Sequence, residues 1–138
     1  MQNGLEMKLY AFTMDCREPV ELAAFYAALL EMDTGSDGTE YAWVYPPGTK
    51  QDEPPFIVFQ RNPDYIPPVW PEEPGAQQQM AHLDIAVNDL EKAVAHAVRC
   101  GATVSQTQYS DKWTVMFDPV GHPFCLCLLE HLFPADAE

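Results

Sequence analysis

An internal duplication is the strongest constraint on the fold, because the pattern that opens the chain returns about halfway along it. Residues 10–16 form an apolar, strand-like run that meets the helix starter Glu18-Pro19, and residues 81–87 likewise run into Asn88-Asp89. Each copy then continues into a helical stretch and several short strands. Such self-similarity predicts two copies of one supersecondary unit, and we expect a ligand site where the copies face each other.

The length bounds the architecture. At 138 residues the chain has the size of one domain, able to bury about 68% of its unfolded surface in a single core. No stretch approaches the ~20 apolar residues of a membrane span, and residues 1–9 lack the apolar region of a secretory signal. We therefore expect a single soluble domain, cytoplasmic and without a membrane partner.

The charge is strongly acidic. Seven basic residues against 21 acidic ones give a formal charge of −14, which repels phosphate backbones and disfavours nucleic acid as a partner. The same field would attract a cationic ligand; alternatively, it serves only solubility through self-repulsion. The four cysteines form no CxxC pair and are expected to be reduced, mostly buried thiols rather than structural zinc ligands.

The first module is expected over residues 8–61. A strand is expected over residues 8–16. One of its faces should pack against a helix and the other should stay open, and these faces hold Tyr10, Phe12, Met14 and Cys16 on the helix side and Ala11, Thr13 and Asp15 on the open side. Pro19 suits a first helical position, and the apolar spacing after it predicts a helix over residues 19–30. Short strands are expected at residues 41–45 and 56–60, the latter preceded by the breakers Pro54-Pro55. The second strand of this module has the weakest pattern.

A proline-rich link separates the modules at residues 62–80. Its five prolines exclude a regular helix or a strand ladder. The segment is then a stiff connector that wraps the surface. Alternatively, it is a lid whose Tyr65 and Trp70 close over a bound ligand.

The second module, over residues 81–131, repeats the order. A strand over residues 81–87 should lead to Asp89 as the N-cap of a helix that ends near residue 99, just before Gly101. The inner face of this helix should hold Ala93, Val94, Ala97 and Val98. Three strands are expected at residues 103–108, 112–117 and 123–129, the last two joined by a turn at residues 118–122. The fold class is therefore α+β, with two βαβββ modules.

Two segments carry a family resemblance. Residues 14–30, MDCREPVELAAFYAALL, are similar to the first strand and helix of the vicinal oxygen chelate superfamily, which holds glyoxalases, bleomycin resistance proteins and dioxygenases. The more specific match is HLDIAVND at residues 82–89, followed by WTVMFDPVGHPFCLC at residues 113–127, which resembles the glyoxalase-like subgroup. The resemblance implies paired βαβββ units whose sheets curl around a shared cavity. It also implies a homodimer, which would cover the edges of the sheets.

In the superfamily's metalloenzymes, the first and last strands of each module supply four ligands to one divalent ion. Carried over by position, these ligands fall on His82, Ala11, Cys125 and Ile57, although a register shift could bring Gln60 to the last position. Ala11 and Ile57 offer no lone pair, so the resemblance predicts that the metal site has been lost and that the protein needs no cofactor. Alternatively, zinc or copper is held by His82, Cys125 and Cys127, with residues two apart on a strand pointing the same way.

Several polar and aromatic residues are candidates for a site. Asp84 shares a strand face with His82, and Thr13 and Asp15 are their approximate counterparts in module one. His82 beside a carboxylate could act as a general base, or the carboxylates could simply pair with backbone and basic groups. The residues expected to contact a ligand are Thr13, Asp15, Trp43, Tyr65, Trp70, Trp113 and Cys125.

The function predicted from the sequence is a glyoxalase-like small-molecule binding protein without the superfamily's metal. It would sequester a cationic or aromatic ligand, as antibiotic-sequestering members of the superfamily do. The alternative is a superfamily enzyme, a lyase, isomerase or dioxygenase, that uses His82 as a metal ligand or uses His82 and Asp84 as an acid–base pair. A third interpretation is a dimeric scaffold with a vestigial cleft.

Overall fold

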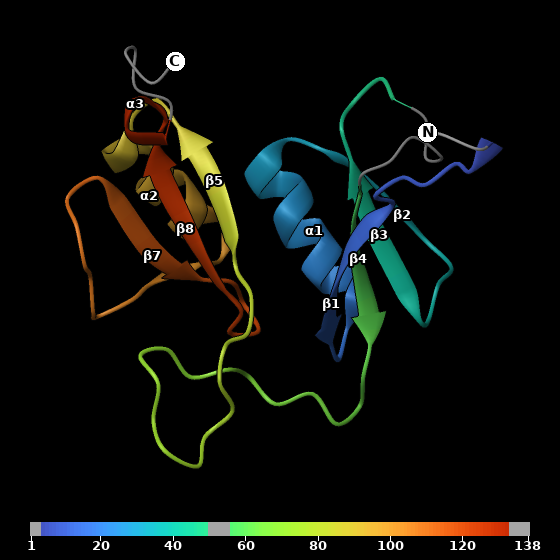
Figure 1. The fold of residues 1–138 in the computed structure, drawn as a ribbon, viewed down its shortest axis with the longest axis horizontal. Coiled ribbons are helices and arrows are strands. Elements are labelled where there is room, and N and C mark those ends of the chain that lie inside the picture. Colours follow the sequence, from blue (N-terminus) through green and yellow to red (C-terminus); the bar gives the residue numbers. More distant parts are fainter. Residues whose placement is uncertain (1–3, 50–55, 133–138) are drawn as a thin grey trace. The chain divides into compact units, whose positions relative to one another are not determined.

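The computed structural model describes residues 4–49 and 56–132, and the chain divides into two compact units, Met1–Tyr65 and Ile66–Glu138 (Figure 1). Each unit has its own four-stranded mixed sheet, and the sheets are not closed into a barrel. Each follows the order βαβββ, which confirms the predicted α+β fold. The Pro54-Pro55 pair lies outside the described residues.

Unit one has the strand order β1-β4-β3-β2, with β1 and β4 parallel and the other pairs antiparallel. Its elements are β1 (Ala11–Cys16), α1 (Pro19–Leu30), β2 (Asp33–Ser36), β3 (Tyr41–Tyr45) and β4 (Phe56–Arg61). The helix has the predicted bounds and begins at its proline. The second strand, DTGS, lacks β-branched or aromatic residues apart from Thr34, which is why the sequence pattern defines it poorly.

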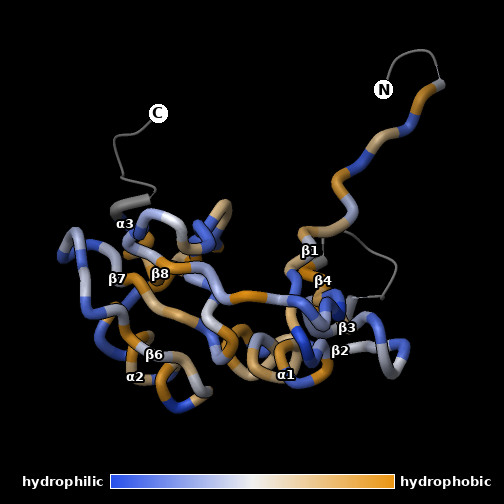
Figure 2. Tube along the Cα trace, turned by 90° about the horizontal axis from the view of Figure 1, so that it is seen from below, coloured by the Kyte–Doolittle hydropathy of each residue, from blue (hydrophilic) through white to orange (hydrophobic). Residues whose placement is uncertain are grey.

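Helix α1 covers one face of the first sheet. Tyr26 of the helix stacks on Phe59 of β4, with ring centroids 5.4 Å apart, and both side chains are fully buried. Met14 and Cys16 of β1 are buried as well, as the alternation predicts. The prediction was wrong at the start of this strand, since Tyr10 and Phe12 are exposed. Among the described residues, the pairing of β1 with β4 begins at Ala11 and Phe56, and the segment before Ala11 runs outward as an extended chain (Figure 2).

Unit two repeats the arrangement with the strand order β5-β8-β7-β6. Its elements are β5 (Leu83–Val87), α2 (Leu90–Cys100), β6 (Thr103–Val104), β7 (Trp113–Phe117), β8 (Pro123–Leu128) and α3 (Leu129–Leu132). Asp89 caps α2 by accepting a hydrogen bond from the backbone N–H of Lys92 at 3.0 Å, as predicted. Gly101 ends the helix with φ at 121°, a conformation that favours glycine.

The inner face of α2 is narrower than predicted. Ala97 is fully buried and Val94 is half-buried, but Val98 is 48% exposed, so its assignment to the inner face was wrong. Successive helical residues are rotated by about 100°. Val98 therefore lies at the margin of the stripe that centres on Ala97, where the sheet no longer covers it.

The strand predicted over residues 103–108 is shortened to Thr103–Val104. The side-chain amide of Gln108 takes over the pairing with β7. Its Nε2 donates to the carbonyl oxygens of Ser105 and Val115 at 2.9 and 3.0 Å, and its Oε1 accepts from the N–H of Val115 at 2.8 Å. The backbone makes one more bond to β7, from the N–H of Ser105 to the carbonyl oxygen of Val115 at 3.0 Å, before it leaves the sheet.

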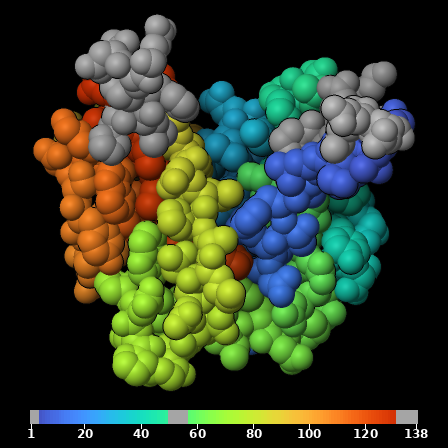
Figure 3. Space-filling view, viewed as in Figure 1, coloured from blue at the N-terminus to red at the C-terminus, as the bar shows by residue number. Residues whose placement is uncertain are grey.

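The link after residue 65 belongs to unit two. Val69 and Gln78 form an isolated bridge within it, and Pro67 approaches the turn between β7 and β8 at Gly121. In the space-filling view, the lime-coloured atoms of this segment lie beside and below the orange atoms of the same unit (Figure 3). The link is thus packed on its own unit, through Pro67 at the turn.

Candidate functional site

The face of the first sheet opposite α1 presents two rows of side chains. Strand register places Thr13, Val58 and Trp43 in one row. The next row holds Asp15, Gln60 and Tyr41. Residues in register on neighbouring strands share a face, so this helix-free face combines hydroxyl, carboxamide, carboxylate and aromatic groups.

A pocket of about 360 Å³ opens on this face. It is lined by Tyr10, Ala11, Thr13, Asp37, Tyr41, Trp43 and Val58. Its volume lies within the range of small-molecule sites, and most of its wall is apolar. Two of the residues expected to contact a ligand, Thr13 and Trp43, therefore lie in one pocket of unit one.

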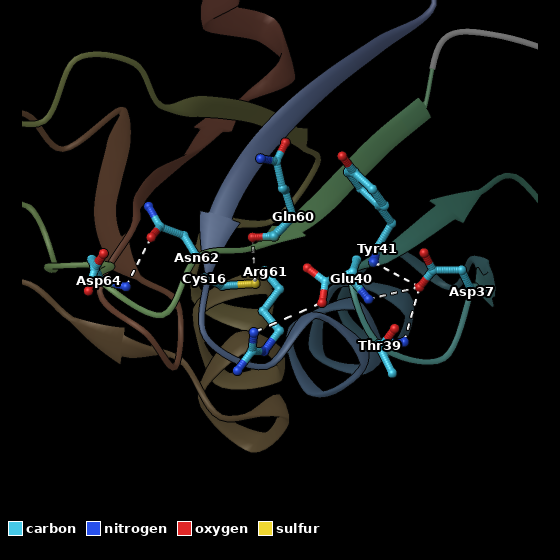
Figure 4. A network of polar contacts seen from close by, with 9 residues as sticks. All are labelled: Cys16, Asp37, Thr39, Glu40, Tyr41, Gln60, Arg61, Asn62 and Asp64. Carbon is cyan, nitrogen blue, oxygen red and sulfur yellow. Dashed lines mark hydrogen bonds and ion pairs between the residues drawn. The ribbon is translucent and has the colours of Figure 1, made fainter.

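Asp37 is a pocket residue that the sequence did not single out. Figure 4 shows its carboxylate turned back onto the loop that follows it, where Oδ1 accepts backbone N–H groups of Thr39, Glu40 and Tyr41 at 3.0, 2.9 and 3.0 Å. The N–H of Tyr41 above all, then that of Thr39, lowers the pKa of Asp37. The carboxylate therefore stays ionised at neutral pH. Its sequence context, Ser-Asp-Gly, signals a turn but not a pocket.

The end of this sheet holds a polar network. Asn62 donates from Nδ2 to Asp15 Oδ2 at 3.0 Å, and its own Oδ1 accepts the backbone N–H of Asp64 at 2.9 Å. Arg61 Nη1 lies 3.9 Å from Glu40 Oε1, so the guanidinium beside the sheet is directed to a carboxylate outside the pocket (Figure 4). Asp15 thus has a side-chain amide partner at the end of β1.

Tyr65 is placed differently from the other candidates. It is only 7% exposed, and its carbonyl oxygen accepts a hydrogen bond from Arg17 Nη2 at 3.2 Å within unit one. A buried ring offers little surface for stacking on a ligand. Its role in ligand contact therefore stays a prediction without support from its position.

In unit two, the helix-free face brings together His82, Asp84 and Cys125. His82 Nε2 lies 3.3 Å from Asp84 Oδ1, and one ligand atom of each of the three residues lies within 4.8 Å of the others. Cys127, two residues along β8, has its sulfur 4.0 Å from Asp84 Oδ1. The sequence placed His82 and Asp84 on one strand face and left their interaction open, and strand register adds Cys125 beside Asp84.

Burial controls the chemistry of the two thiols. Burial first, then the negative charge of Asp84, raises the pKa of Cys125 to about 12. The same two causes raise the pKa of Cys127. Both thiols are therefore protonated at neutral pH, which makes them poor nucleophiles as they stand.

A ladder of stacked rings covers this face. Trp70 stacks on His82 and on Tyr109, with centroids 5.2 and 6.0 Å apart, and Tyr109 stacks on Trp113 at 5.7 Å. Trp70 and Trp113 also pack against the buried cluster of Val115, Cys125 and Cys127. The two tryptophans were predicted site residues, whereas Tyr109 lies in a polar loop whose sequence gives no sign of the stack.

Comparisons with known proteins agree with this architecture. A family model described as a glyoxalase-like domain matches residues 11–127. The chain is a member of the glyoxalase-like domain family. This confirms the resemblance to the vicinal oxygen chelate superfamily. No curated protein matches the chain.

Solved structures of the same superfamily share the fold at low sequence identity. A glyoxalase/bleomycin resistance protein/dioxygenase family enzyme from Burkholderia phytofirmans is 15% identical, with 88% of this chain and 98% of that chain covered and a TM-score of 0.62. An antibiotic-binding protein from a Streptomyces species is 15% identical, and the alignment covers 89% of this chain and 96% of that chain with a TM-score of 0.55. A fosfomycin resistance protein from Listeria monocytogenes is 9% identical, and the alignment covers 90% of this chain and 94% of that chain with a TM-score of 0.62. Within residues 4–49 and 56–132, no helix of this glyoxalase-like protein is long and apolar enough to cross a membrane.

One of the ligand positions carried over to unit one, Ala11, has no donor atom. The assignment of Ile57 to the ligand face was wrong, whereas the alternative position, Gln60, lies in register with Asp15 on the face opposite α1. Ile57 pairs in register with Phe12 and with the buried Val44, which places it on the helix side of the sheet. Its neighbour Val58 occupies the pocket face and is no ligand either. An offset of one residue along a strand exchanges the two faces.

Proposed function

We propose that this glyoxalase-like protein binds a small organic cation with an aromatic body in the pocket of unit one. The observation that carries the proposal is the pocket itself, of about 360 Å³, whose wall includes the aromatic residues Tyr10, Tyr41 and Trp43 and the acidic residue Asp37. Aromatic walls bind flat apolar surfaces and also attract cations to their faces. None of the described residues that line this wall is basic.

The electrostatics favour a cation over an anion. The hydrogen bonds to Asp37 keep a full negative charge at the pocket, and the chain as a whole has a formal charge of −14. Such a field raises the local concentration of cations and repels anions. Arg61 is directed to Glu40, so it does not offset the charge of Asp37 in this pocket.

Structural neighbours give a precedent for a small-molecule ligand. One is named an antibiotic-binding protein and another a fosfomycin resistance protein. At 15% and 9% identity they share the fold alone, so the ligand of this chain is proposed from its own pocket. We therefore propose binding without chemistry, and without the superfamily's metal site that spans both modules.

Calorimetric titration with a matched pair of probes tests the proposal. Naphthylmethylamine is a cation at neutral pH, and naphthylmethanol has the same ring system without the charge. We expect the amine to bind about tenfold more tightly, because a carboxylate and aromatic faces contribute on the order of 1 kcal/mol or more to a cation. Equal affinities, or tighter binding of the alcohol, would contradict a cation site.

Three variants test whether the probe binds in the pocket of unit one. Trp43→Ala should weaken binding of the amine about tenfold through lost ring contact. Asp37→Asn keeps an oxygen acceptor for the loop but removes the charge, so it should abolish the preference for the amine over the alcohol. Trp113→Ala in unit two is the matched control and should leave both affinities unchanged. Loss of binding in Trp113→Ala alone would overturn the assignment to unit one.

A second candidate function is favoured by one contact. The 3.3 Å distance between His82 Nε2 and Asp84 Oδ1 is suited to a general base oriented by a carboxylate, as in a superfamily lyase or isomerase. Such an enzyme would lose turnover in His82→Ala while keeping its fold. For the binding protein that we propose, His82→Ala should leave the affinity for the amine probe unchanged.

We also propose that the protein acts as a cytoplasmic homodimer. Within its own unit, β1 is an outer strand, and outer strands expose backbone groups that a second copy can cover. Light scattering should give about twice the chain mass of 15.5 kDa. A mass near that of a single chain would contradict the dimer.

A further inference from the structure

We infer that residues 5–9 form an arm that pairs with the same residues of a second copy of this chain, as two antiparallel strands related by a twofold axis at Met7. The arm pair rests on the homodimer proposed above and names the segment that joins its two copies. It is independent of the proposed ligand, because none of the residues 5–9 lines the pocket.

The arm leaves both its side chains and its backbone open to a partner. Leu5, Met7 and Leu9 are 52%, 67% and 74% exposed, and the two residues between them are exposed as well. No hydrogen bond joins the backbone of residues 5–9 to another described residue. An extended chain with unpaired backbone groups is a template for a second strand.

The side chains of the arm alternate in character. Hydrophobic and hydrophilic colours follow one another along it in Figure 2, because Glu6 and Lys8 separate the three apolar residues. Successive side chains of an extended chain point to opposite sides. One side of the arm is therefore apolar, and the other side holds one acid and one base.

The order of these residues selects a second copy as the partner. Leu-Glu-Met-Lys-Leu is symmetric about Met7, except that an acid on one side of the centre corresponds to a base on the other. In an antiparallel pair with Met7 at the axis, Glu6 lies opposite Lys8 of the partner subunit, and Leu5 lies opposite Leu9 of the partner subunit. Opposite charges and apolar side chains directly across an antiparallel ladder stabilise it.

Other pairings of the two arms lack this complementarity. A shift by two residues keeps the apolar sides together but sets Glu6 opposite Glu6 or Lys8 opposite Lys8, and parallel pairing in register does both. Like charges directly opposite each other destabilise a ladder. Only the pairing centred on Met7 therefore satisfies both sides of the arm.

The charge of the whole chain makes this arm a favourable place for contact. Two copies with a formal charge of −14 repel each other, whereas the arm holds one acid and one base and has no net charge. Neither Glu6 nor Lys8 makes an ion pair with another described residue. Both charges are therefore available to a second arm.

Packing of the arm on its own chain is the competing explanation. It would also cover Leu5, Met7 and Leu9, but it makes no demand on the order of Glu6 and Lys8. A two-stranded pair is marginally stable in water, so we expect a dimer that dissociates on dilution. A dependence of that dissociation on the order of the two charges separates the explanations.

Charge reversals in the full chain provide the test, with sedimentation equilibrium as the measurement. Glu6→Lys and Lys8→Glu each set like charges opposite each other at two places in the dimer, so each should weaken association at least about fivefold. The double variant Glu6→Lys/Lys8→Glu restores opposite charges and should associate as the original chain does. The matched control, Glu72→Lys, makes the same change in net charge as Glu6→Lys at an exposed position of unit two and should not weaken association.

A mixture of the two single variants sharpens the test. Each is complementary only to the other, so equal amounts, with one of them labelled with ¹⁵N, should form mainly the mixed dimer in native mass spectrometry. A statistical mixture of dimers, or a double variant as weak as the single ones, would overturn the arm pair and leave a homodimer through another surface. A chain that stays monomeric at every concentration would contradict the homodimer as well.

Discussion

The two units have the same element order and the same strand arrangement, but their helix-free faces differ in chemistry. In unit one, Thr13, Val58 and Trp43 form a row beside an open pocket. At the corresponding row of unit two stand Asp84, Cys125 and Val115, with buried thiols beneath stacked rings. The helix sides, in contrast, both bury large apolar residues of the central strand.

This difference shows which side of the sheet must keep the same kind of residue in both copies of a duplicated fold. The helix side must exclude water for the sheet to form, so apolar alternation is required in both copies. The helix-free side has no such requirement and can present either a ligand pocket or a donor cluster. The duplication thus predicts the scaffold of both units but the site of neither.

Truncation of the central-strand phenylalanines should have the largest effect. Phe59 and Phe124 are both fully buried, so replacement of either by alanine should lower the free energy of unfolding by about 3–5 kcal/mol. For Phe59, the ring contact with Tyr26 is lost as well. Denaturant titration measures both. If the two units have separate cores, hydrogen exchange should accelerate mainly in the mutated unit, and uniform acceleration along the chain would contradict this.

The next largest effect is a difference in alkylation rate between the cysteines. A pKa of about 12 in place of 9.0 leaves Cys125 with roughly a thousandfold less thiolate near pH 8. Cys100, which is partly exposed on α2, should therefore react with iodoacetamide first in the native protein. Peptide mass mapping over time checks the order. Modification of Cys125 at the rate of Cys100 would show that its sulfur is neither buried nor protonated.

Alanine substitutions at two glycines test how closely the link packs on the turn between β7 and β8. Gly38 and Gly121 have nearly the same φ, 96° and 97°, but a Cβ at Gly121 would lie 2.9 Å from the Cβ of Pro67, whereas Gly38 has open space. Gly38→Ala should lower the free energy of unfolding by about 1 kcal/mol for backbone strain alone. Gly121→Ala should lower it by about 3 kcal/mol, since a steric clash is added. Equal losses would mean that Pro67 does not pack on this turn.

The smallest expected effect is a contrast in pH dependence. The folded pKa of Asp37 is lowered from 3.8, so its contribution to stability is present above that value and is lost as pH falls through the folded pKa. The folded pKa of Cys125 is raised from 9.0 to about 12, so its contribution is present below pH 9 and is lost between pH 9 and 12. Asp37→Asn should flatten only the acid limb of the stability curve, and Cys125→Val only the alkaline limb. A change in the opposite limb would contradict the assignments.

The sequence predicts those features that depend on local pattern. Pro19 and Asp89 mark the starts of both long helices, and the alternation in β1 predicts the burial of Met14 and Cys16. The same pattern could not show that Tyr10 and Phe12 are exposed, because their exposure depends on what packs against this end of the strand. Strand pairing across the sheet is invisible to local periodicity.

The candidate site could be predicted only in part for the same reason. His82 and Asp84 are close in sequence, so their proximity follows from strand geometry, whereas Cys125 joins them through register. An offset of one residue led to Ile57 in place of Val58. Asp37 reaches the pocket through a loop, and the Gln108 amide replaces a strand, two arrangements with no periodic signal.

Chemical-shift mapping tests most directly the claim that the two units have different sites. A ¹⁵N-labelled sample would be titrated with naphthylmethylamine. The account predicts that the amine shifts the amides around Thr13, Asp37 and Trp43 and leaves those around His82, Asp84 and Cys125 unchanged. Shifts centred on unit two would contradict it.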